Sequence, residues 1–177
     1  MIIGNKVILR EKNPADAWDD YAWETDPELA RLDAAPVLSI PYSRFLSDYR
    51  SELYRSSTTN HRFAVDTLDG EHIGNCSYYN LDETRGEVEL GIMIGNRDYW
   101  NKGYGTDAVT TLVNYVFRQM KLKRIYLKTL DWNIRAQKSF QKCGFTPYGQ
   151  LAKDGYNFVL MEIYRSQWRK KQAKTQG

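Results

Sequence analysis

The chain has 177 residues, of which 42% are hydrophobic and 27% charged, with a formal net charge of +3. This length and composition are typical of one globular domain. No apolar stretch approaches the ~20 residues that span a membrane, and the N-terminus MIIGNKVILRE becomes charged too early for a signal peptide, so we expect a cytoplasmic protein without membrane or nucleic-acid partners.

The first half of the chain alternates between strand and helix patterns. Asn13 is a typical helix cap with Pro14 at the first helical position, and Asp26-Pro27 is expected to break that helix. The predicted elements are a strand at 6–11, helices at 13–26 and 42–54, and strands at 61–67, 72–81 and 87–94 that form an antiparallel meander.

The second half continues with longer helices. The predicted elements are a helix at 106–120, a strand at 124–130, a helix at 133–144 stopped by Gly144, and strands at 145–152 and 157–167. The whole pattern predicts an α/β fold with a mixed, mainly antiparallel sheet of about seven strands and helices on both faces. The basic residues 169–177 are expected to form a frayed tail.

Histidines and cysteines are too few for several kinds of site. Cys76 and Cys143 are the only cysteines, and their spacing matches no metal or disulfide framework. His61 and His72 are the only histidines, which argues against a histidine metal site or a Ser-His-Asp triad. We therefore expect no metal.

A glycine-containing loop, YWNKGYGTDA at 99–108, precedes the long helix. A Walker loop needs Gly-Lys-Ser/Thr, whereas here Lys102 precedes Gly103. Gly103, Gly105 and Ala108 match the dinucleotide pattern G-x-G-x-x-A, but hairpin strands rather than a βαβ unit precede the loop. Free N–H groups at a helix N-terminus nevertheless favour a phosphate ligand.

Two motifs together resemble the GCN5-related N-acetyltransferase (GNAT) superfamily. WNKGYGTDA resembles the acetyl-CoA pyrophosphate loop, and NIRAQKSFQKCGF at 133–145 resembles the second cofactor motif, one helix and one strand later. Within the superfamily the chain resembles the RimJ/RimL ribosomal-protein and spermidine N-acetyltransferase branch. The resemblance implies a single GNAT domain over 1–168 and acetyl-CoA as co-substrate.

The resemblance also implies a set of cofactor-binding residues. They come from the end of the 87–94 strand, the glycine loop and the 133–144 helix. The set is Ile92, Met93, Ile94, Trp100, Asn101, Lys102, Gly103, Tyr104, Gly105, Thr106, Asn133, Arg135, Phe140 and Lys142. The backbone near Met93 and Ile94 is expected to separate from the next strand and receive the pantetheine arm.

Some positions depart from the family pattern. Asn101 replaces a common glycine, a change that asparagine tolerates at unusual dihedral angles. Phe140 replaces a tyrosine that relatives use to protonate the CoA thiolate, so that role cannot be transferred. Ser139 is adjacent to Phe140, but neighbouring helical residues point about 100° apart, so we expect Ser139 to point away from Phe140. Asn157 replaces an aspartate of the branch.

Acyl transfer to an amine needs a neutral nitrogen, so a base is useful. Glu89 is our candidate, because relatives carry a carboxylate there, and Glu87 on the same strand face is the second choice. Solvent-exposed strand glutamates are the alternative reading.

The acceptor is harder to identify. Residues 11–33 are strongly acidic, and in this family that region borders the acceptor cleft, which favours a cationic acceptor such as a polyamine-like amine or a protein N-terminus. A solvated acidic face is the simpler reading. The alternative function is an acetyl-CoA-binding regulatory module without catalysis, and a homodimer is possible.

Overall fold

The computed structural model describes residues 1–177 and contains one eight-stranded sheet. The strands are β1 (Ile2–Ile3), β2 (Val7–Glu11), β3 (His61–Thr67), β4 (His72–Asp82), β5 (Glu87–Ile94), β6 (Arg124–Leu130), β7 (Thr146–Lys153) and β8 (Tyr156–Tyr164). Their order is β1-β2-β3-β4-β5-β6-β8-β7, and every neighbouring pair is antiparallel except β5 and β6. The predicted mixed, mainly antiparallel sheet is confirmed.

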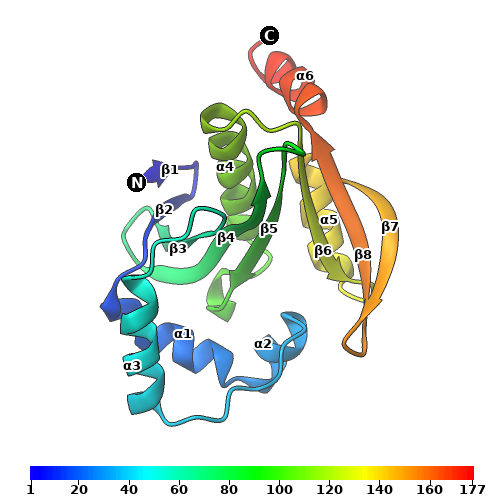
Figure 1. Cartoon of the computed structure of the whole chain (residues 1–177). Coiled ribbons are helices and arrows are strands. Elements are labelled where there is room, and N and C mark those ends of the chain that lie inside the picture. Colours follow the sequence, from blue (N-terminus) through cyan, green and yellow to red (C-terminus); the bar gives the residue numbers. More distant parts are fainter.

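Six α-helices accompany the sheet (Figure 1). They are α1 (Ala17–Glu24), α2 (Pro27–Leu32), α3 (Tyr42–Leu53), α4 (Tyr104–Gln119), α5 (Ile134–Cys143) and α6 (Arg165–Thr175). Short 3-10 turns, η1 (Pro14–Asp16) and η2 (Arg97–Tyr99), precede α1 and the glycine loop. None of the helices combines the length and apolar composition that a membrane crossing needs.

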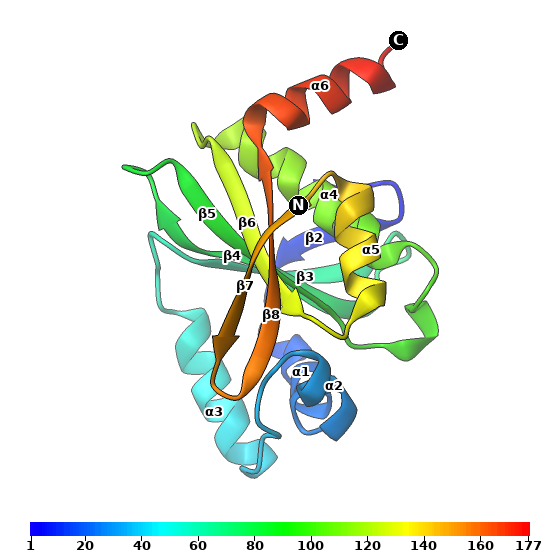
Figure 2. The same ribbon diagram turned by 90° about the vertical axis from the view of Figure 1, so that its right-hand side faces the viewer.

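The helices form two groups. α4 and α5 lie together beside the sheet, whereas α1, α2 and α3 gather at one end of it (Figure 2). The main core joins α4 and α5 to the strands, with Leu112, Phe117, Ile125 and Met161 among its fully buried side chains. A smaller core of Ala17, Phe45 and Tyr49 joins α1 to α3.

The structure differs from the sequence prediction at two helices. Asp26-Pro27 ends α1 as expected but also begins α2, because the Asp26 carboxylate accepts hydrogen bonds from the backbone N–H groups of Glu28 and Leu29. The predicted last strand ends at Tyr164, and the basic tail continues as α6 to Thr175. Trp168 packs on Phe117 and thereby attaches α6 to the body.

The sheet opens between its two parallel strands. β5 pairs with β6 only from Glu87 to Glu89, opposite Arg124 to Tyr126. Beyond Glu89 the strands separate towards the end of the sheet at which α1 and α2 lie (Figure 1). The predicted separation near Met93 and Ile94 is confirmed, and it leaves one edge of residues 90–94 without a strand partner.

Candidate active site

The glycine loop turns sharply into α4. Asn101 and Gly103 have positive φ angles of 57° and 83°, in the left-handed region. Asparagine and glycine are the residues that adopt this conformation most readily, which explains both positions. Gly103 is the N-cap of α4 and offers no side-chain cap. The first N–H groups of the helix are therefore free for an anion, and the helix dipole adds partial positive charge.

One cavity of about 370 Å³ extends from this loop along the unpaired end of β5 to α2 and α5. Every predicted cofactor residue lines it except Lys102, which is exposed and whose carbonyl oxygen accepts a hydrogen bond from Lys6 Nζ. Their binding roles stay a prediction. The cavity brings together segments that lie far apart in the chain, from Leu29 to Lys142.

Helix α5 contributes more residues than the sequence reading named. Lys138 and Ser139 also line the cavity, and Ser139 Oγ lies 2.7 Å from Thr106 Oγ1, which joins α5 to the first turn of α4. The expected angle between the directions of Ser139 and Phe140 stays a prediction, but both side chains line the cavity. Arg135, Ser139 and Lys142 are spaced by four and three residues, so helical periodicity alone would have placed them on one face.

Trp100 fixes the loop against both neighbouring elements. Its indole N–H donates a hydrogen bond of 2.7 Å to the Ile94 carbonyl oxygen at the end of β5. The guanidinium of Arg135 lies 4.2 Å from its ring centroid, a cation–π contact. The tryptophan thus joins β5, the loop and α5, and holds the mouth of the cavity in shape.

Phe140 and Asn133 have structural partners beside the cavity. Phe140 is 7% exposed and packs edge-on against Phe145. The Asn133 side-chain oxygen accepts a hydrogen bond from the Ala136 N–H and caps α5. The Asn133 oxygen therefore already has one partner, and Phe140 has no proton to donate.

Glu89 lies where the gap opens, opposite Tyr126 in the last pair of β5 and β6. It is 6% exposed and does not line the cavity. Its carboxylate accepts hydrogen bonds from Tyr79 Oη, Asn80 Nδ2 and Lys128 Nζ, at 3.1, 3.1 and 2.9 Å. Protein donors surround the buried carboxylate, so any proton must reach it through a partner such as the Tyr79 hydroxyl.

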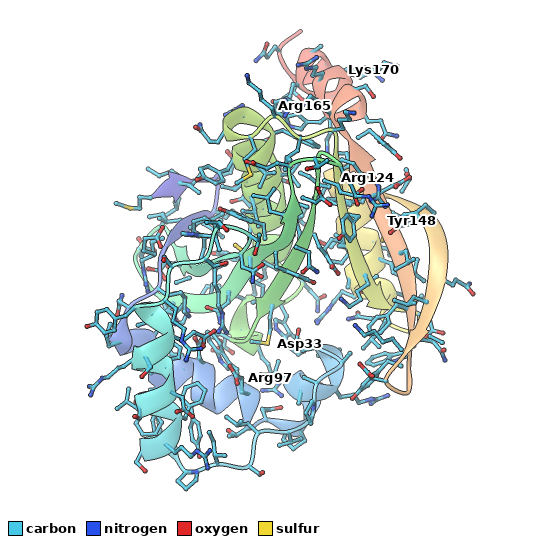
Figure 3. All side chains as sticks on the ribbon, in the orientation of Figure 1. Asp33, Arg97, Arg124, Tyr148, Arg165 and Lys170 are labelled. Carbon is cyan, nitrogen blue, oxygen red and sulfur yellow. The ribbon has the colours of Figure 1, made fainter.

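Glu87 lies two residues farther from the gap. Its carboxylate pairs with Arg124 at 3.0 Å, and Arg124 also binds Glu162 at 2.6 Å. This arrangement joins β5, β6 and β8 (Figure 3, Arg124). The exposed-glutamate reading is wrong for both Glu89 and Glu87, since neither side chain is free in solvent.

The acidic segment 11–33 is not the open anionic wall that we expected. Seven of its carboxylates have a cationic or histidine partner within 4.0 Å. The partners are His61 for Glu11, Arg10 for Asp16, His72 for Asp19, Lys12 for Asp20, Arg62 for Glu24, and Arg97 for both Asp26 and Glu28. Most of the segment's charge therefore holds α1 and α2 to the sheet.

Asp20 is the most deeply buried of these paired carboxylates. Its side chain is fully buried and lies 2.7 Å from Lys12 Nζ, which is itself 5% exposed. Asn75 and Tyr49 donate further hydrogen bonds to it, at 2.6 and 2.9 Å. Burial raises the pKa of Asp20, but the charges of Lys12 and Arg62 and the hydrogen bonds from Lys12 and Asn75 outweigh it, and the pKa is lowered. This carboxylate cannot face a ligand.

No group of histidine, cysteine, aspartate or glutamate side chains is arranged to hold a metal ion. The glycine turn, the helix N-terminus and the cations of α5 instead fit a phosphate-bearing ligand, and the unpaired edge of β5 fits an extended chain beside it. These are the two parts of a coenzyme A molecule, a pyrophosphate and a pantetheine arm.

Comparisons with known proteins agree with this reading. The sequence model of the acetyltransferase (GNAT) domain matches residues 6–146. The uncharacterized N-acetyltransferase p20 of Bacillus licheniformis is 29% identical over 168 residues, which cover 89% of this chain and 93% of that protein. The spermidine N(1)-acetyltransferase of Escherichia coli K12 is 29% identical over 137 residues, 72% of each chain.

A solved structure shows the same fold. It is the spermidine N-acetyltransferase from Vibrio cholerae in complex with CoA and spermine, with a TM-score of 0.81 and 18% sequence identity. The match covers 92% of this chain and 98% of that one. The arrangement of strands and helices is therefore shared over almost the whole length.

Proposed function

Because the chain belongs to the acetyltransferase (GNAT) family and is an acetyl-CoA-dependent N-acetyltransferase, we propose that it moves the acetyl group by direct transfer to a small cationic primary amine. The observation that carries this proposal is the cavity that runs from the glycine loop along the unpaired end of β5 to α2. It provides one continuous site in which a thioester and an amine can meet.

The cofactor half of the proposal rests on the backbone. The N–H groups at the start of α4 would bind the pyrophosphate, with Arg135 and Lys142 adding positive charge at the rim. The unpaired edge of Met93 and Ile94 would hold the pantetheine arm and donate to the thioester oxygen. Acetyl-CoA supplies the activated acetyl group. The protein aligns the thioester with the amine and polarises the thioester carbonyl.

The amine must lose a proton before it attacks. We retain Glu89 as the base, acting through the Tyr79 hydroxyl, which contacts its carboxylate. Tyr79 lines a second cavity between α3 and the sheet rather than the first, so we propose that water carries the proton from the amine to the Tyr79 hydroxyl. The new C–N bond forms as the C–S bond breaks, and the CoA thiolate is a tolerable leaving group because its pKa is near that of a free thiol, about 8.5.

The acceptor class follows from the chemistry of relatives and from the cavity. Relatives are named spermine and spermidine acetyltransferases, and we propose a polyamine-like amine or a protein N-terminus for this chain. The proposal includes membership of the RimJ/RimL-like branch, a catalytic domain over 1–168, a homodimer and a cytoplasmic location. Size-exclusion chromatography with light scattering tests the dimer.

The decisive experiment mixes the protein with acetyl-CoA and a panel of amines. The panel contains spermidine, a simple alkyl monoamine, an aminoglycoside and a short peptide with a free N-terminus. Thiol release and product mass are followed, and we expect one cationic class to gain a single acetyl group. Tight CoA binding without turnover of any amine would contradict the proposal and favour an acetyl-CoA-binding regulatory module.

A further inference from the structure

Asp33 differs from every other carboxylate of the acidic segment 11–33. The others have partners within 4.0 Å, but the Asp33 carboxylate has no hydrogen bond and no ion pair. It is also the only acidic side chain that lines the cavity, at which Arg135, Lys138 and Lys142 are the basic ones. The cavity therefore has cations for an anionic ligand and one free anion.

The position of Asp33 is set by α2. Its backbone N–H donates to the Leu29 carbonyl oxygen at 3.0 Å, so Asp33 closes the last turn of the helix. Leu29 is buried, and with Leu32 it contributes apolar surface to the same cavity. Figure 3 shows Asp33 between α2 and the open end of the sheet.

Two contacts hold α2 over the cavity. At its start, Asp26 and Glu28 pair with Arg97, at 2.9 and 2.7 Å (Figure 3, Arg97). Near its end, the Arg31 guanidinium lies 4.6 Å from the ring centroid of Trp132, which precedes α5. The helix is thus attached both to the segment before the glycine loop and to the segment before α5, which keeps Asp33 at the cavity.

No cation of the protein pairs with this exposed carboxylate. Partial desolvation by the surrounding protein raises the pKa of the Asp33 carboxyl, and the charges of Arg62 on β3 and Lys128 on β6 lower it only in part. Lys128 is already paired with Glu89, and Arg62 lies 3.7 Å from Glu24. Neither cation contacts Asp33, so an ammonium group brought by a ligand would compensate its charge.

We infer that Asp33 is the specificity-determining residue that binds the positive charge of the amine acceptor, an inference that rests on the proposed acetyl transfer. The acceptor is then a small amine with an ammonium group beside the reacting centre. The remaining acidic residues of segment 11–33 contribute to folding rather than to recognition. A single anion also favours one well-placed charge over a long array of charges.

The test compares Asp33→Asn with Asp69→Asn, a matched loss of one exposed carboxylate in the β3–β4 turn outside the cavity. For a small alkyl diamine, whose second nitrogen remains an ammonium, Asp33→Asn should raise KM about 10- to 100-fold, the range for losing a charged hydrogen bond. Asp69→Asn should leave KM unchanged, and Asp33→Glu should restore part of the loss. Acetyl-CoA affinity by calorimetry should be equal in all variants.

A fluorinated alkylamine that is neutral at the assay pH serves as a second acceptor. Asp33→Asn should leave its KM nearly unchanged, because no ammonium has lost its partner. An equal increase of KM for both acceptors would mean that the substitution distorts the cavity and would overturn the charge role. Unchanged KM for the cationic amine would overturn it directly.

A separate measurement tests the role of Asp33 if the proposed function itself fails. If the wild type acetylates no amine in the panel, spermidine binding to the CoA-saturated protein is measured by calorimetry. Loss of binding in Asp33→Asn alone supports the inference without any turnover. Equal binding in both variants, or no binding to the wild type, overturns it.

Discussion

The cofactor side of the cavity and its acceptor side are constructed from different parts of the chain. The cofactor side consists mainly of backbone: a turn with positive φ at Asn101 and Gly103, a helix N-terminus and an unpaired strand edge. The proposed acceptor side borders the charged side chains of the acidic segment 11–33, of which only Asp33 lines the cavity. Most of these charges are paired with residues of distant segments, such as Asp26 with Arg97, 71 residues later.

This difference shows which features of a binding site can be predicted directly from the sequence. Glycine spacing determines backbone geometry locally, so the cofactor loop follows from ten consecutive residues. A carboxylate, by contrast, is available to a ligand only when folding brings it no cation. The acidic segment looks uniform in sequence, yet it separates into seven paired carboxylates and one free one.

The largest expected effect comes from Glu89, which lies where the two sides meet. Glu89→Gln keeps the shape but removes the proton acceptor, and we expect kcat to fall about 10²- to 10⁴-fold near neutral pH. The loss should shrink at high pH, where more of the amine is already neutral. Steady-state kinetics across pH measures this.

Two comparisons make the Glu89 result specific. Glu87→Gln is the matched control and should affect kcat much less, because Glu87 pairs with Arg124 away from the gap. A loss in Glu89→Gln that is equal at all pH values would indicate that Glu89 only positions Lys128. Wild-type kcat in Glu89→Gln would exclude the base.

The second prediction contrasts Asp20 with Asp33. Asp20→Asn leaves the buried Lys12 charge uncompensated and should lower the free energy of unfolding by about 3–5 kcal/mol. Asp33→Asn removes an unpaired carboxylate and should leave stability equal or slightly higher at neutral pH. Urea denaturation of both variants measures this, and equal losses would remove the distinction between folding and recognition charges.

The pH dependence has opposite signs at these two residues. The pKa of Asp20 is lowered in the folded state, so its stabilisation is present above the unfolded value of about 3.9 and is lost as pH falls through the lower folded value. The pKa of Asp33 is raised, so its ionisation costs stability as pH rises through the folded value. Asp33→Asn should therefore gain relative stability from acidic to neutral pH.

The third prediction tests the cofactor side. Gly103→Val introduces a β-branched residue at φ +83° and blocks backbone approach to the pyrophosphate, so acetyl-CoA affinity should fall at least about 100-fold, or about 2.7 kcal/mol. The protein itself leaves space there, since the nearest atom to an added Cβ is Lys6 Cε at 3.7 Å. Calorimetric titration measures the affinity.

Gly155 offers a matched control for this substitution. It has φ +79° and nothing within 4 Å of an added Cβ, and it lies in the β7–β8 hairpin. Gly155→Val should cause similar backbone strain with unchanged acetyl-CoA affinity. Unchanged affinity in Gly103→Val as well would contradict the loop assignment.

The smallest expected effect is that of Phe140→Tyr. The new hydroxyl would restore the proton donor that relatives use, and kcat should stay equal or rise. Phe140 is 7% exposed and packs against Phe145, so thermal stability is measured beside kcat. A fall in kcat with unchanged stability would show that this position needs an apolar side chain.

Much of the fold was available from the sequence because its signals are local. Alternating apolar residues mark β3 and β5 with their observed bounds, and Gly144 ends α5 in the left-handed conformation as expected. The helix α2 was missed because Asp26-Pro27 both ends one helix and caps the next. The helix α6 was missed because its attachments are tertiary: Trp168 packs on Phe117, and Arg165 donates hydrogen bonds to carbonyl oxygens at the end of α4.

The sequence alone thus determined the order of most elements, the family, the cofactor loop and the expected separation of β5 from β6, since each depends on residues close together in the chain. The tertiary structure alone decided that the pairing of β5 with β6 ends at Glu89 and Tyr126, and that α2 lies at the cavity. It also decided which charged side chains form ion pairs within the protein. Ion pairing depends on the distances between segments, and these distances cannot be read from the sequence. Asp33 differs from Asp20 only in what the fold brings next to it.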